Sequence, residues 1–158
     1  MSNTDDSAKL LSLPQTGRLI ALDPGTKRVG VAVCDPSQTI ASPIRTLTRR
    51  SWKILLADVA GIIEEFDATA LIIGLPLEFD GSSSEWTAEA IDMARKFELS
   101  LTIPAFLQDE RATSYEARGK FWSERPRQHP FTKIDAEAAA IILADFLDRL
   151  RQVRLHGA

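Results

Sequence analysis

The sequence has only one cysteine and two histidines among its 158 residues. Cys34 therefore has no partner in the chain for a disulfide, and a zinc site built on several cysteines is excluded. No apolar run reaches the roughly 20 residues that a membrane-spanning helix needs. Residues 1–17 also lack the basic start and the apolar stretch of a secretory signal. These absences predict a cytoplasmic protein with no membrane partner.

An excess of positive charge is also missing, because 22 acidic residues outnumber 19 lysines and arginines and leave a net charge of -3. The overall charge thus gives no sign of a nucleic-acid-binding protein. The basic residues are nonetheless grouped, and local groups can bind phosphates even on an acidic chain. They gather in residues 27–28, 45–50, 111–120 and 125–133. Without further motifs, scattered surface charges explain these groups equally well.

The length and the hydrophobic fraction of 44% suit one domain with its own apolar core. Residues 1–17 are polar and contain Pro14 and Gly17, so we expect a flexible leader there. The sequence predicts a single domain over residues 18–152, followed by a tail over residues 153–158.

The order of predicted elements indicates an α/β fold. Three apolar runs come first and predict an antiparallel meander of strands, of which the third contains Pro43 and is expected at an edge. Helical connections make the two later strands parallel. The strands are predicted at residues 18–23, 29–34, 40–47, 70–74 and 101–107, and the helices at 51–66, 82–97, from 113 and at 134–150. We therefore expect a mixed five-stranded sheet with helices on both faces.

Acidic residues stand where the predicted elements begin and end. Asp23 closes the first strand, Glu110 follows the last strand, and Asp135 opens the final helix. Ligands of such sheets bind at the carboxyl ends of the strands, where these three acids could converge. Carboxylates that lie close together repel one another unless a cation neutralises them, and Mg²⁺ or Mn²⁺ prefers such oxygen ligands. The pattern predicts metal-dependent hydrolysis of phosphodiester bonds.

Each acid also has a plain structural explanation, and for Glu110 it is a surface turn with a local ion pair in the triplet Asp109-Glu110-Arg111. Asp23 precedes Pro24 and Gly25 in a sequence typical of a turn, and Asp135 fits a helix cap that begins at Thr132. Only the joint placement of the acids favours a site.

Cations near these acids are candidates for binding a phosphate. The turn after Asp23 offers Gly25, Lys27 and Arg28, although a hairpin tip with solvated charges explains them as well. Arg111, in the segment after the last strand, could bind a phosphate through two hydrogen bonds. A local ion pair is its alternative role.

Four segments together resemble the YqgF family. They are LIALDPGTKRVGVAVCDP (19–36), LIIGLPLEFDGSSSEWT (71–87), DERATSYEA (109–117) and KIDAEAAAIILADFLD (133–148). They occur in the family's order and spacing, across residues 18–150. Members are also called Holliday junction resolvases or pre-16S rRNA nucleases. The sequence departs from the family at Glu78, where the family often has asparagine.

The resemblance implies an RNase H-like fold related to the RuvC resolvases. It implies that Asp23, Glu110 and Asp135 are catalytic and hold Mg²⁺ or Mn²⁺. It further implies that the partner is RNA, namely the 16S rRNA precursor in pre-ribosomal particles, whose 5′ end the enzyme trims.

Three alternatives stay open. A resolvase would take structured DNA and needs paired active sites, whereas the sequence announces no stable interface and suggests a monomer or weak dimer. Actin-like ATPases and sugar kinases have a phosphate-binding hairpin of the same kind as residues 23–30, but they need a second domain to enclose the nucleotide. A noncatalytic RNA-binding assembly factor would not depend on the acids.

Overall fold

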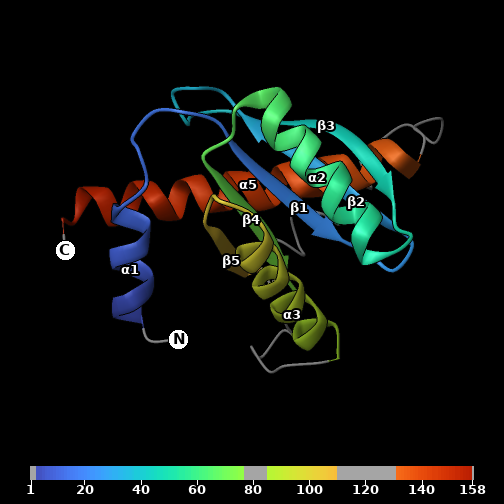
Figure 1. The fold of residues 1–158 in the computed structure, drawn as a ribbon. Helices are drawn as coiled ribbons and strands as arrows, with labels where there is room; N and C mark the ends of the chain where they lie inside the picture. The colour runs from blue at the N-terminus through green and yellow to red at the C-terminus, as the bar shows by residue number, and fades with distance from the viewer. Residues whose placement is uncertain (1–2, 77–84, 110–130, 158) are drawn as a thin grey trace.

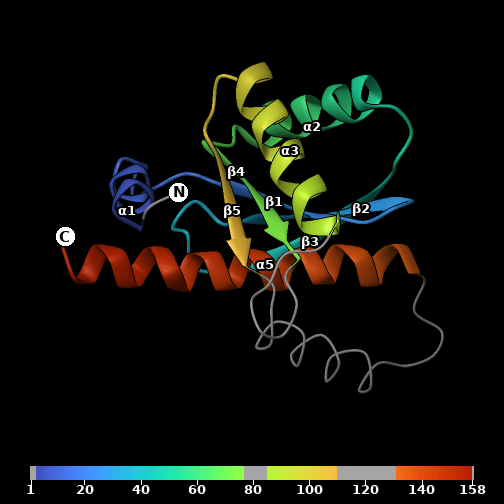
Figure 2. The ribbon, with the colours of Figure 1, turned by 90° about the horizontal axis from the view of Figure 1, so that it is seen from below.

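The computed structural model describes residues 3–76, 85–109 and 131–157, which form three layers. A five-stranded sheet lies in the middle, with helix α5 (Phe131–Leu155) on one face. Helices α2 (Trp52–Phe66) and α3 (Glu85–Ser100) cover the other face (Figures 1 and 2). None of the helices in these ranges is long and apolar enough to cross a membrane.

The sheet has the predicted mixture of antiparallel and parallel strands. The strands are β1 (Leu19–Pro24), β2 (Arg28–Cys34), β3 (Ala41–Thr48), β4 (Ala70–Leu75) and β5 (Ala105–Asp109). Their order is β3-β2-β1-β4-β5, with β1, β2 and β3 antiparallel and β4 parallel to both β1 and β5. The carboxyl ends of β1, β4 and β5 therefore meet at one rim of the sheet. The α/β fold predicted from the sequence is confirmed.

Local sequence explains most of the element boundaries. The Ser51 side chain accepts a hydrogen bond of 3.2 Å from the Ile54 N–H and caps the start of α2. Helix α2 ends at Asp67, which adopts the left-handed conformation with φ 52°. Pro43 lies in the edge strand β3, opposite a register shift between Val31 and Ala32. An edge strand tolerates the missing N–H of proline, as the sequence predicted.

Two apolar cores lie on the two faces of the sheet. On the α5 face, buried residues of that helix such as Ala139 and Phe146 pack against Ala21 of β1 and Phe106 of β5. On the other face, residues of α2 and α3 pack against the alternate residues of the same strands, including Leu22. This alternation fixes which face each rim residue belongs to.

The structure has a helix in the segment where the sequence predicts a flexible leader. Residues Asn3–Leu11 form helix α1, and Leu10 and Leu13 are only 1% and 5% exposed in the core on the α5 face. Lys9 Nζ donates to the Ala105 carbonyl oxygen at 2.6 Å and pairs with Glu98 at 3.2 Å. The segment is too short and too polar for its apolar residues to form a recognisable periodic pattern.

The remaining boundaries also differ from the prediction. The last strand begins at Ala105 and not at residue 101, because residues 101–104 form a bend before it. Helix α5 continues to Leu155, beyond the predicted domain end at residue 152. Arg154 donates to Gln38 Oε1 at 2.9 Å and so ties this last turn to the fold. The predicted helix from residue 113 and Glu78 lie outside the described residues.

Candidate functional site

The first candidate residues lie in the tight hairpin between β1 and β2. The Gly25 N–H donates to the Arg28 carbonyl oxygen at 2.9 Å, and a Cβ on Gly25 would lie 2.6 Å from that same oxygen. Only glycine fits this turn without a shift of the backbone. The hairpin sets Asp23 directly opposite Gly30, and it leaves Lys27 exposed at its tip.

Gly30 also marks the place where α5 meets the sheet. A Cβ on Gly30 would overlap the carbonyl oxygen of Asp135 and come within 2.9 Å of the Ala136 nitrogen. The start of α5 therefore crosses the sheet directly over Gly30, and a larger residue would hold it away. Asp23 is the partner of Gly30 across the ladder. The fold thus brings two acids that are far apart in the sequence to the same glycine.

Strand alternation shows that Asp23 points toward α5. Leu19 and Ala21 belong to the core on the α5 face, whereas Leu22 belongs to the opposite core. Asp23 follows with its side chain on the same face as Ala21, because side chains alternate along a strand. Asp23 and Asp135 consequently share one face and one rim.

Asp135 carries an ion pair that its position in the sequence does not predict. Arg28 Nε donates to Asp135 Oδ2 at 2.7 Å, and both side chains are partly exposed. The predicted phosphate-binding arginine is thus the partner of a predicted metal ligand. A guanidinium at this position neutralises the carboxylate when no other cation is present.

Asp109, the acid at the end of β5, lies on the other face of the sheet. Gln108 accepts a hydrogen bond from Arg149 of α5, so its side chain lies on the α5 face, and Asp109 alternates to the face of α2 and α3. Asp109 pairs with Leu75 at the same rim of the sheet. Glu110 and Arg111, the remaining predicted site residues, lie outside the described residues.

Two arginines that the sequence did not single out hold the rim in place. Arg49 donates through its backbone N–H to the Lys27 carbonyl at 2.8 Å and through Nη1 to the Gly25 carbonyl at 2.9 Å. Arg149 Nη1 donates to the Leu107 carbonyl at 2.9 Å and to Gln108 Oε1 at 3.3 Å. Burial lowers the pKa of Arg149. In the sequence, Arg149 could have been noticed only as a charged residue at a position of α5 that faces the sheet.

The donor set at the rim suits a hard divalent cation. Asp23 and Asp135 offer carboxylate oxygens, and Gly30 leaves no side chain between them. Within residues 3–76, 85–109 and 131–157, no three metal-ligating side chains group together. Two of the three predicted acids are thus placed together, and the third predicted ligand, Glu110, is not described.

Comparison with known proteins shows the family of the chain. The RuvX family, described as Holliday junction resolvase, matches residues 17–149. A protein of Rhodobacter capsulatus is 35% identical over 148 residues, covering 92% of this chain and 93% of that protein. A protein of Koribacter versatilis is 37% identical over 134 residues, covering 84% and 88%. Both are named as pre-16S rRNA nucleases.

A solved structure supports the fold alone. RuvC of Thermus thermophilus, in complex with a Holliday junction substrate, aligns with a TM-score of 0.54 and 14% sequence identity. The alignment covers 84% of this chain and 96% of that one. The five-stranded sheet and its flanking helices are therefore an RNase H-like arrangement.

Proposed function

The chain belongs to the RuvX family of resolvases and nucleases, enzymes that hydrolyse phosphodiester bonds, and we propose that it trims the 5′ end of the 16S rRNA precursor with Mg²⁺ or Mn²⁺. The observation that carries this proposal is the juxtaposition of Asp23 and Asp135 across Gly30. Helix packing alone does not require two carboxylates on one face of the same rim of the sheet.

Asp23 and Asp135 are the proposed metal ligands, together with Glu110. Asp109 lies on the opposite face from Asp23, so Glu110 is the better third ligand of the two adjacent acids. When bound, divalent metal ions would activate a water and stabilise the leaving oxygen of the phosphodiester.

The cations of the hairpin have separate proposed roles. Lys27 is exposed at the tip, where it can contact the phosphate next to the scissile bond. Arg28 can exchange its carboxylate partner Asp135 for a phosphate oxygen, because a guanidinium binds both groups with the same geometry. Gly25 and Arg49 keep the hairpin backbone in one conformation. Arg111 remains a proposed phosphate contact.

Metal should stabilise the fold, and this response should depend on Asp135. We expect Mn²⁺, at about 100 times its dissociation constant, to raise the melting temperature by about 5–10 °C. Asp135→Asn should remove most of that response, because it deletes one ligand and relieves the repulsion with Asp23. Arg28→Gln should enlarge the response, since it removes the cation that neutralises the Asp135 carboxylate.

Thermal unfolding with and without Mn²⁺ measures these responses. Arg45→Gln is the matched control, because its ion pair with Glu65 lies between β3 and α2, away from the rim. An Asp135→Asn protein that responds to metal as fully as the wild type would mean that Asp135 is only the ion-pair partner of Arg28.

Cutting of four-way DNA junctions is the second candidate, and the description of the family favours it. The deciding experiment incubates the protein with Mn²⁺ and either precursor 16S rRNA or a four-way junction. We expect cleavage near the 5′ end of the RNA and weak or absent paired nicking of the junction. Robust paired nicking without RNA cleavage would reverse the order of the two candidates. Cells that need the protein but tolerate Asp23→Asn would instead indicate a noncatalytic assembly factor.

A further inference from the structure

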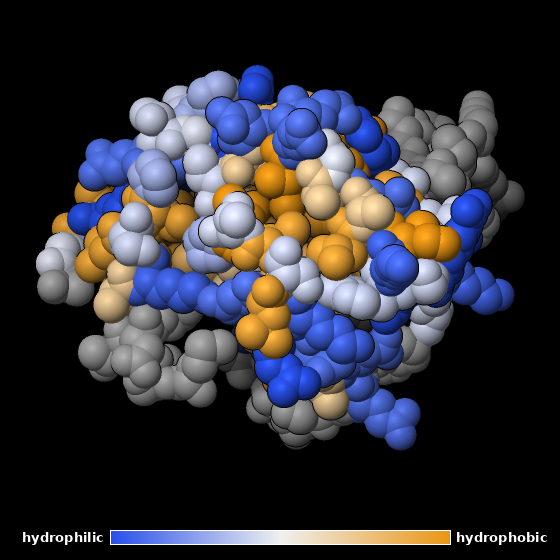
Figure 3. Space-filling view, in the orientation of Figure 1, coloured by the Kyte–Doolittle hydropathy of each residue, from blue (hydrophilic) through white to orange (hydrophobic). Residues whose placement is uncertain are grey.

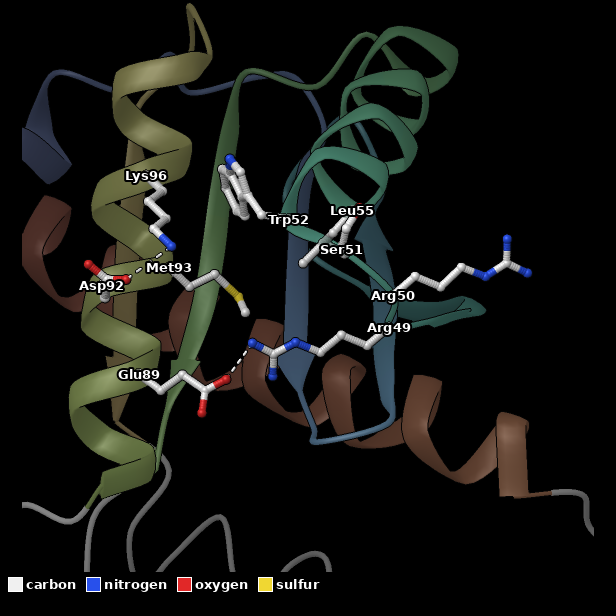
Figure 4. Close-up of a pocket in the computed structure, with 9 residues that line it drawn as sticks. All are labelled: Arg49, Arg50, Ser51, Trp52, Leu55, Glu89, Asp92, Met93 and Lys96. Carbon is white, nitrogen blue, oxygen red and sulfur yellow. Dashed lines mark hydrogen bonds and ion pairs between the residues drawn. The ribbon is translucent and has the colours of Figure 1, made fainter.

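A cleft lies between the start of α2 and one side of α3, on the face opposite α5. Its volume is about 240 Å³, and its lining includes Arg49, Arg50, Trp52, Glu89, Asp92 and Lys96. Figure 4 shows the side chains of Arg49 and Lys96 between the two helices, with Arg50 pointing outward from the start of α2. On the surface in Figure 3, hydrophilic side chains surround apolar ones on this face.

The cleft has more positive than negative charge, although the whole chain carries -3. Glu89 pairs with Arg49, and Asp92 is shared between Lys96 at 3.3 Å and Arg95 at 2.7 Å. Arg50 has no ion pair with any residue that the structure describes. Exposed ion pairs such as that of Lys96 are weak, so a phosphate can replace the carboxylate as the partner of the cation.

Apolar side chains give the cleft a surface for a base or a sugar. The Trp52 ring packs edge-on against Phe97, with 4.7 Å between the ring centroids. Lys96 Nζ lies 5.6 Å from the centre of the same indole. Met93 and Leu55 form the floor of the cleft and are only 4% and 2% exposed, so Trp52 is the main apolar contact. Cations next to an aromatic ring are the combination with which proteins bind unpaired nucleotides.

The cleft lies close to the hairpin that follows Asp23. A smaller hollow beside it shares Arg49, Glu89 and Met93 and is also lined by Pro24, which follows Asp23 in β1. Arg49 belongs to both hollows and donates to the Gly25 carbonyl of the hairpin at 2.9 Å. The cleft therefore lies beside the hairpin, so a strand that leaves the rim past the hairpin reaches the cleft on the other face.

We propose that this cleft is a second binding site for the substrate, which takes the single-stranded nucleic acid on one side of the scissile phosphate. Lys96 and Arg50 contact its backbone phosphates, and the Trp52 side of the cleft packs against a base or ribose. A duplex does not offer the faces of its bases to such a surface, so the strand here is unpaired. The inference rests on the proposed nuclease function and extends it to the path of the substrate.

The salt dependence of binding tests this site directly. Fluorescence anisotropy measures the affinity for a labelled single-stranded RNA, and for DNA of the same sequence, in EDTA at several salt concentrations. In the wild type, the logarithm of the association constant decreases with the logarithm of the salt concentration. The magnitude of this negative slope should be smaller by about 0.7 in each of Lys96→Gln and Arg50→Gln, because each variant loses one phosphate contact with a single strand. Arg151→Gln is the matched control, since it lies on α5 in an exposed ion pair with Asp148.

The outcomes separate this inference from the proposed function. The cleft is supported if both cleft variants have a smaller salt dependence and Arg151→Gln keeps that of the wild type. Equal losses on RNA and DNA show that the cleft binds the sugar-phosphate backbone, which both nucleic acids share. If both cleft variants have the same salt dependence as Arg151→Gln, the cleft does not bind the substrate. The proposed nuclease function still stands if the wild type cleaves RNA. A wild type that neither binds nor cleaves single strands overturns both. Thermal unfolding confirms that each variant is folded.

Discussion

Asp23→Asn should lower metal-dependent RNA cleavage by more than about 100-fold, the upper end of the loss when a partner of a metal ligand is removed. Asp23 lies next to the end of β1 at the rim, on the face of α5 and opposite Gly30. An asparagine keeps the shape of the side chain and its place in the turn, but it removes the charge that holds a divalent cation. The rate of cleavage of end-labelled precursor RNA under single-turnover conditions, with Mn²⁺, measures the effect.

A matched variant tests whether the loss is specific to the site. Asp58→Asn makes the same chemical change on α2, away from the rim, and should leave the rate within about twofold, since surface substitutions rarely matter. Cleavage by Asp23→Asn at the wild-type rate would remove Asp23 from the active site and leave it with the role of a turn residue.

Gly30→Ala should damage both stability and catalysis. Its new methyl group would overlap the Asp135 carbonyl oxygen, which is backbone and cannot rotate away. The start of α5 must shift, so we expect the free energy of unfolding to fall by about 1–3 kcal/mol, the usual range for overpacking. Asp135 moves with the helix, so cleavage should fall at temperatures where the variant is still folded. Urea unfolding and the cleavage assay measure the two effects.

Gly61→Ala is the control for this substitution. Gly61 lies within α2, and no atom is within 4 Å of a Cβ built on it. Alanine should therefore stabilise the helix by about 0.5–1 kcal/mol and leave cleavage unchanged. A Gly30→Ala protein that behaves like Gly61→Ala would show that α5 does not press against β2 at this residue.

Much of the fold could be predicted because it depends on local patterns. Apolar runs of strand length and the start of a helix at residue 51 are read within a few residues, and both agree with the structure. Pro43 restricted its strand to an edge for an equally local reason, its missing N–H. Helix α1 could not be predicted because its buried Leu10, like Leu13 just after the helix, packs only against segments that are distant in the sequence.

The contacts that organise the candidate site could not be predicted. Arg49 and Arg149 stand in the sequence as ordinary charges, yet they donate to carbonyls of the hairpin and of β5. Hydrogen bonds between residues about 25 or 40 positions apart leave no periodic signal. The pairing of Arg28 with Asp135, 107 positions apart, is hidden for the same reason.

The sequence by itself determined the residue types of the chemistry: acids at strand ends, a glycine turn with two cations, and four segments that resemble one family. Only the tertiary structure decided how these residues meet. Strand register put Asp23 opposite Gly30, and the absence of a side chain there let α5 bring Asp135 to the same place. Alternation along β5 set Asp109 on the other face of the sheet. Residue type and spacing are properties of the chain, whereas register and helix approach depend on packing between distant segments, which no local pattern encodes.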